Sequence, residues 1–175
     1  MIDNSSLFSY FETPPILQKL LELKDTDWKD KNFFQKNNSS YLRAKMIPLV
    51  GEVWQEKDEN YVKEKYSYFE KEIIDLHNYL LSKFKNGNIN RCIIVYSPMH
   101  TVITPHVDDE GIKNNFKRFI IPIVTYPDVY YEFGDESKQL AANEMWEINS
   151  SIPFSVKNYS HTGNIHITVD WNIEA

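Results

Sequence analysis

The feature that most constrains the fold is a change in sequence pattern near residue 88. After this point, short runs rich in β-branched and aromatic residues follow one another to the C-terminus, separated by Gly, Pro, Asn, Asp and Ser. The eight runs are RCIIVYS, TVITPHV, RFIIPIVTY, VYYEFG, KQLAA, EMWEIN, PFSVKN and NIHITVDW. Runs of this length and spacing are typical of an antiparallel sandwich or jelly roll, not of a parallel α/β sheet.

The N-terminal half has a different pattern, mainly that of helices. PPILQKLLELK has helical spacing after two prolines that suit a helix start, and the stretch 61–87 is strongly amphipathic and ends at Gly87. SYLRAKMIPLV has strand character, and Pro48 favours an edge position for it. We therefore predict an α+β fold in one domain, 1–175, in which a mainly helical part (1–88) supports a double-stranded β-helix, or cupin-like jelly roll (89–175).

Composition limits the class of protein. With 175 residues and 42% hydrophobic content, the chain can bury one substantial core. The formal net charge of −6 argues against a general nucleic-acid binder or a protein of anionic membranes. We expect no nucleic-acid partner and no membrane association, and the sequence carries no signal for an oligomeric state.

Cysteine and hydropathy patterns indicate the compartment. Cys92 is the only cysteine, which excludes an intrachain disulfide and a thiolate metal cluster and suits a reducing environment. No signal-peptide pattern and no apolar run of about 20 residues is present. We expect a soluble cytoplasmic protein.

The stretch TPHVDDEG holds a candidate metal site. In an extended chain, residues two apart point the same way, so His106 and Asp108 can offer two ligands on one face. A third ligand must come from elsewhere in the chain. Alone, the pair is a weak signal, because a His-x-Asp at a strand end also forms a simple polar turn.

The segments around this pair resemble a known family. TVITPHVD, FKRFIIPIV and NEMWEINSSIPFSVKNYSHTGNIHITVDW are similar, over about residues 90–172, to the aspartyl/asparaginyl β-hydroxylase and cis-proline-hydroxylase branch of the Fe(II)/2-oxoglutarate dioxygenases. The resemblance implies hydroxylation of an amino-acid or peptide side chain, with Fe(II) and 2-oxoglutarate as cofactors. It places the metal on His106 and Asp108 and assigns Arg118 to the co-substrate.

The sequence departs from this family at three positions. Phe154 stands where the family has its distal metal histidine, and phenylalanine has no lone pair for a metal. Asn164, ten residues on, stands in place of the arginine that grips 2-oxoglutarate, and it is neutral. Ile120 replaces a strand histidine. His166 shares a face with position 164, so we include it with Arg118 among the candidate cofactor-binding residues.

Other histidines offer alternative ligands. His161 lies in the turn NYSHTGN, which we expect at the barrel rim, and His100 lies in the turn SPMHT, from which it could approach the barrel mouth from outside. His77 falls within the long helix and is read as a surface or boundary residue. Arg118 is alternatively a surface charge, and Trp146 and Trp171 are expected to pack in the sandwich.

Three functions follow from these observations. The first is an oxygenase-like protein whose hydroxylase activity is impaired or altered. The second is an active oxygenase in which His161, His166 or a substrate group replaces the missing histidine. The third is a non-catalytic module that binds a small molecule or peptide on the same fold. The sequence does not identify a substrate.

Overall fold

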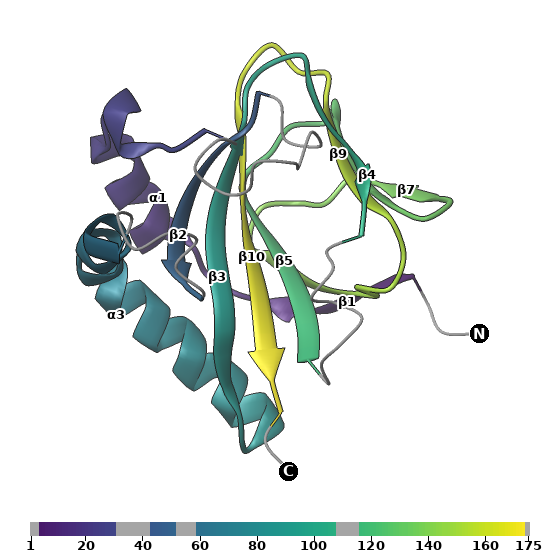
Figure 1. Cartoon of the computed structure of the whole chain (residues 1–175). Coiled ribbons are helices and arrows are strands. Elements are labelled where there is room, and N and C mark those ends of the chain that lie inside the picture. Colours follow the sequence, from purple (N-terminus) through teal and green to yellow (C-terminus); the bar gives the residue numbers. More distant parts are fainter. Residues whose placement is uncertain (1–3, 31–42, 52–58, 108–115, 174–175) are drawn as a thin grey trace.

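The computed structural model describes residues 4–30, 43–51, 59–107 and 116–173. Two antiparallel sheets face each other, with helices packed on the outer side of the larger one (Figure 1). This is the predicted double-stranded β-helix with helical support, and the fold class is confirmed.

The large sheet has six strands in the order β1-β8-β5-β10-β3-β2. Their bounds are β1 Ser5–Tyr10, β8 Glu144–Ile148, β5 Phe116–Val124, β10 Asn164–Asn172, β3 Asn88–Ser97 and β2 Lys45–Val50. The small sheet has the order β4-β9-β6-β7, with bounds β4 Thr101–His106, β9 Phe154–Asn158, β6 Val129–Phe133 and β7 Glu136–Lys138.

The helices cover the outer face of the large sheet. They are α1 Pro14–Glu22 and α3 Glu59–Phe84, with a short 3-10 turn, η1, at Asp25–Asp27. The apolar stripe of α3 supplies Phe69, Ile73, Leu76 and Leu80 to the outer core, each of them buried. Burying side chains of this kind contributes about 1.5–3 kcal/mol each, so this stripe is a main reason why α3 docks. Neither helix in the described ranges is long and apolar enough to cross a bilayer.

Strand β10 separates two cores, because successive side chains point to opposite faces. Ile165, Ile167, Val169 and Trp171 pack toward the helices, in the outer core. The alternate residues Asn164, His166, Thr168 and Asp170 point toward the small sheet, into the space between the two sheets. The interior of the barrel therefore receives a polar row from the middle of the large sheet.

The N-terminal half differs from the prediction in one respect. It supplies both edges of the large sheet as well as the helices. The edge position of β2, with Pro48, was predicted, but β1 was not. Strand β1 pairs with β8, from Ser5 opposite Ile148 to Tyr10 opposite Glu144. Its sequence, SSLFSY, has little strand periodicity, and its pairing partner lies far away in the chain.

Gly87 was expected to stop the long helix, but α3 ends at Phe84 and Lys85 takes the left-handed conformation there, with φ 68°. Gly87 instead leads into β3 with φ 118°, against the end of β10. A Cβ at this position would lie 2.3 Å from the carbonyl oxygen of Asn172, so a side chain cannot fit without moving backbone.

We predict that Gly87→Ala lowers the free energy of unfolding by at least about 3 kcal/mol, because backbone strain of about 1–3 kcal/mol adds to a steric overlap. Gly134→Ala is the matched control. Gly134 also has a positive φ, 63°, but its nearest neighbour to an added Cβ is 3.6 Å away. That variant should lose about 1–2 kcal/mol. Urea unfolding of the three proteins measures both values, and equal losses would contradict the steric account.

Candidate functional site

His106 lies at the end of β4, directly opposite Phe154 at the start of β9. The two rings are 6.2 Å apart between centroids, in an edge-to-face arrangement. The Nδ1 atom of His106 is 2.8 Å from the carbonyl oxygen of Thr104. Asp108, the second predicted metal ligand, lies outside the described residues. The residue that faces His106 across the two strands is thus a hydrocarbon ring.

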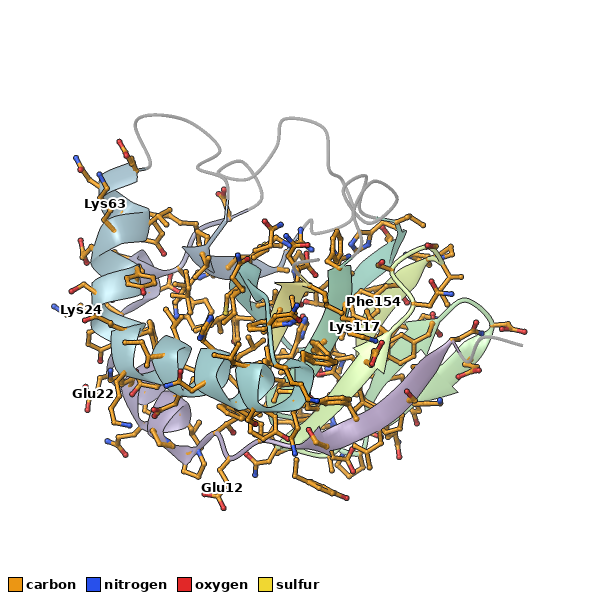
Figure 2. All side chains as sticks on the ribbon, turned by 90° about the horizontal axis from the view of Figure 1, so that it is seen from below. Glu12, Glu22, Lys24, Lys63, Lys117 and Phe154 are labelled. Atoms are coloured by element: carbon orange, nitrogen blue, oxygen red, sulfur yellow. The ribbon has the colours of Figure 1, made fainter. Side chains whose placement is uncertain are left out.

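Phe154 points into the barrel and packs among other rings. Its centroid is 5.6 Å from that of Phe133 and 6.4 Å from that of His166. Figure 2 shows Phe154 among the strands, on the side of the molecule away from α3. Two cavities lined wholly by described residues lie beside it, with volumes of about 30 Å³ and about 10 Å³. Even the larger corresponds to one water molecule, so neither has room for a molecule the size of 2-oxoglutarate.

Arg118 on β5 binds Asp170 on β10 through two parallel hydrogen bonds. Its Nε donates to Oδ1 at 2.6 Å and its Nη2 donates to Oδ2 at 2.9 Å. The Nε of Arg91, on β3, lies 2.9 Å from the same Oδ2. Asp170 is opposite both arginines in the strand register, so one carboxylate joins three neighbouring strands. The alternative reading of Arg118 as a surface charge is wrong, because its side chain is buried.

We predict that Asp170→Asn lowers the free energy of unfolding by about 3–5 kcal/mol, because it removes the counter-charge from buried guanidinium groups. Asp75→Asn is the control, since it breaks an exposed ion pair with Lys71 along α3. An exposed pair of this kind contributes little, and we expect no resolvable change. Chemical denaturation gives both values. Similar losses in the two variants would show that burial does not set the strength of the Asp170 interaction.

A second polar group lies deeper in the barrel, around Tyr131 on β6. The Tyr131 hydroxyl donates to Oδ1 of Asn164 at 3.1 Å, and its ring meets His166 edge-on at 5.7 Å. Within the described part of the chain, Nδ2 of Asn164 and Nδ1 of His166 have no hydrogen-bond partner. Position 164 faces the interior together with position 166, as their spacing predicts.

Every member of this deep cluster is neutral. Burial lowers the pKa of His166 to about 3, because desolvation penalises the imidazolium form. Burial likewise raises the pKa of Tyr131 above its ordinary value. Asn164 carries no charge at any pH. The cluster can donate hydrogen bonds to a polar atom, but it supplies no positive charge for a carboxylate.

The depressed pKa of His166 makes folding pH-dependent. The unfolded chain binds a proton near pH 6.5, whereas the folded chain binds it only near pH 3, so stability is complete above pH 6.5 and falls as the pH drops between these values. Between pH 7.5 and pH 5.0 we predict a loss of about 2 kcal/mol that is absent in His166→Gln. Urea unfolding at the two pH values tests this. His161→Gln, which alters an exposed histidine, should keep the wild-type loss.

The remaining histidines lie away from His106. His100 and His161 occupy turns at the opposite ends of β4 and β9, about 20 Å from His106 at the usual rise per strand residue. The expectation that His100 approaches the barrel mouth is therefore wrong. His77 on α3 is half-buried and packs 5.3 Å from the ring of Trp171, as befits a boundary residue. Trp171 is fully buried. Trp146 packs against the buried apolar cluster between the two sheets, which includes Ile103, Ile120 and Val156.

The polar interactions of some interior residues were not predicted from the sequence. Arg91 and Asp170 interrupt apolar strands, and that interruption was the available signal for a buried ion pair. Tyr131 lies in the run VYYEFG, whose pattern indicates only a strand; the residue packs in the sheet, and its hydroxyl also binds Asn164.

Comparison of sequences gives no assignment, since no protein-family model matches the chain and no curated protein is detectably similar to it. Comparison of structures does find neighbours. HygX from Streptomyces hygroscopicus, solved with nickel, 2-oxoglutarate and hygromycin B, aligns with a TM-score of 0.63 at 8% identity, over 97% of this chain and 83% of that one.

Two prolyl hydroxylases align nearly as well. The enzyme from Trichoplax adhaerens, in complex with a hypoxia-inducible-factor peptide, gives a TM-score of 0.59 at 14% identity, over 98% of this chain and 84% of that one. A prolyl-4-hydroxylase from Pseudomonas putida gives 0.55 at 9%, over 99% and 94%. The chain thus has the fold of the 2-oxoglutarate/Fe(II) oxygenases, and at these identities the likeness shows the fold alone.

Of the two predicted metal ligands, only His106 can be placed, because Asp108 lies outside the described ranges. Within those ranges, no three His, Cys, Asp or Glu side chains come together as a metal site. Phe154 faces His106, Arg118 is bound to Asp170, and the deep end of the barrel is neutral. Among the described residues, the barrel interior is packed and partly polar, and its positive charges are the two largely buried arginines that contact Asp170.

Proposed function

We propose that this chain is an oxygenase-like protein, related to the hydroxylases of amino-acid or peptide side chains, in which Fe(II)/2-oxoglutarate hydroxylation is impaired or altered. The aspartyl/asparaginyl and cis-proline branch is the one that its sequence resembles. The observation that carries the proposal is the position of Phe154, opposite His106 and packed into the barrel.

The metal side of the proposal rests on ligand chemistry. A site for iron in such enzymes uses two histidines and one carboxylate on one face. With phenylalanine opposite His106, the pair His106 and Asp108 would hold iron through one imidazole and one carboxylate, and the affinity should fall substantially. His161 lies at the other end of β9. The ring of Phe154 contacts both His106 and His166, with centroids 6.2 Å and 6.4 Å away, and it occupies the position of the second histidine.

The co-substrate side rests on charge. A charge-assisted contact to a carboxylate contributes about 1.5–3 kcal/mol, and Asn164 cannot make one. Arg118, the other candidate for that role, directs one edge of its guanidinium to Asp170. His166 is buried and its pKa is low, so it offers a neutral ring. Binding of 2-oxoglutarate in the usual manner is therefore disfavoured at both ends of the molecule.

A second candidate is a non-catalytic module for a small molecule or peptide, as peptide binding by the Trichoplax neighbour illustrates. The unpartnered Nδ2 of Asn164, a donor, and the unpartnered ring Nδ1 of His166 favour a neutral polar ligand group for such a module. The small cavities beside Phe154 count against a large ligand at that place. We also propose a cytoplasmic location, on the ground that Cys92 is the only cysteine of the sequence.

Metal analysis and calorimetry test the main proposal. The chain is purified without a tag, incubated with Fe(II) under anaerobic conditions, and titrated with 2-oxoglutarate. We expect iron well below one equivalent and no binding of 2-oxoglutarate at micromolar concentrations. Stoichiometric iron with micromolar 2-oxoglutarate binding, both lost in His106→Ala, would contradict the proposal.

A restoration experiment sharpens this test. Phe154→His combined with Asn164→Arg returns the two missing side chains, and we expect iron content to rise by about tenfold or more, since metal affinity responds to ligand changes on that scale. Phe154→Leu with Asn164→Gln is the matched control, because it alters the same positions without adding a ligand or a charge. An equal rise in both double variants would mean that Phe154 is not what limits metal binding.

A further inference from the structure

Two exposed histidines face each other at the end of the barrel opposite His106. His100 is in the turn between β3 and β4, and His161 is in the turn between β9 and β10; these turns lie side by side (Figure 1). Their ring centroids are 5.4 Å apart. We propose that this histidine pair binds one divalent transition-metal ion that prefers imidazole, for which Zn²⁺ is the probe.

The spacing of the rings matches what such an ion requires. Zinc–nitrogen bonds of about 2.0–2.1 Å place a ring centre roughly 3.2 Å from the metal, so two imidazoles at the tetrahedral angle have centres roughly 5 Å apart. The observed centroid distance of 5.4 Å, with the ring planes at 85°, is close to this value. Imidazole nitrogen is a preferred ligand of Zn²⁺, Cu²⁺ and Ni²⁺.

The two turns are held together by a fully buried side chain, Asn158. Its Nδ2 donates to the carbonyl oxygens of Ser97 at 2.9 Å and Pro98 at 3.0 Å, in the turn that carries His100. The same Nδ2 donates to the carbonyl oxygen of Thr162 at 2.8 Å, in the turn that carries His161.

The acceptor side of Asn158 is occupied as well. Its Oδ1 accepts from the backbone N–H of Ser160 at 3.0 Å and from the Ser160 hydroxyl at 2.6 Å. Both polar ends of one amide are thus used to fix the relative position of the two turns. A pair of ligands on such a frame loses little conformational entropy on binding, which favours metal affinity.

The backbone of His100 is also informative. It has a φ of 52°, in the left-handed region, where Gly and Asn are the less strained choices. His100 is one of only three non-glycine residues with positive φ in the described ranges. Histidine is among the non-glycine residues that are found more often at positive φ, and this conformation places the ring of His100 against that of His161.

This site is independent of the proposed function. It lies about 20 Å from His106, the length of β4, and it shares no residue with the barrel interior. No third His, Cys, Asp or Glu joins the pair within the described ranges, so water would complete the coordination. We therefore expect an open site of moderate affinity.

Calorimetric titration of the tag-free chain with ZnCl₂ tests the proposal. We expect one saturable equivalent whose affinity falls by about tenfold or more in His100→Asn and in His161→Gln. Asn tolerates positive φ, so the first variant keeps the turn. The double variant should lose less binding free energy than the sum of the two single losses, because the two side chains bind the same ion.

Two controls separate this site from others. His77→Gln should leave zinc binding unchanged, and His106→Ala should remove only zinc held at the other end of the barrel. Thermal unfolding of each variant without zinc shows that the fold is retained. Zinc binding that survives both His100→Asn and His161→Gln, or that disappears only in His106→Ala, would overturn the proposal.

Discussion

The carboxylate of Asp170 holds the centre of this structure. It is buried on the middle strand, and it meets Arg118 on one neighbouring strand and Arg91 on the other. A charge in such a place is stable only when its partners are in good geometry, so it selects one register for all three strands. The helices then dock on one face of a fixed sheet, and the small sheet closes over the other.

The same interaction shapes the chemistry of the barrel. Arg118 is already bound to Asp170 and so has a structural role. Beside this pair, Phe154, Ile120 and Ile148 fill the interior around a cavity of about 30 Å³. Farther in, Tyr131, Asn164 and His166 form a neutral group. In the part of the barrel that the structure describes, the interior beside Asp170 is therefore packed with apolar and neutral side chains.

Periodicity accounts for most of what the sequence predicts. The long helix, seven of the eight C-terminal strands and the edge strand with Pro48 follow from local spacing and from turn residues, which act over a few positions. The run KQLAA was a wrong prediction of a strand, since it shares only Lys138 with β7. Strand β1 was missed because it is specified by its partner β8 and not by its own pattern. Local spacing also cannot predict pairings between distant residues, such as Arg118 with Asp170, because each partner is specified by a segment far away in the sequence.

In the candidate site, too, local spacing predicts some features and contacts between distant residues remain unpredicted. Spacing alone indicates that positions 164 and 166 face the same way, and the structure agrees. The closeness of His100 and His161 could not be predicted, since it depends on the side chain of Asn158 reaching two turns at once. Turn signals mark where a chain reverses, but they carry no information about which turns meet.

The pairing of β1 with β8 also affects how the protein is made. Ser5 is synthesised well before its partner Ile148, which lies 143 residues later in the chain. The large sheet cannot acquire this edge until β8 has emerged, so β1 must wait unpaired during synthesis. Contacts between residues that are so far apart in the sequence slow folding. An unpaired strand with Leu7 and Phe8 is also a natural place for chaperone binding until β8 arrives.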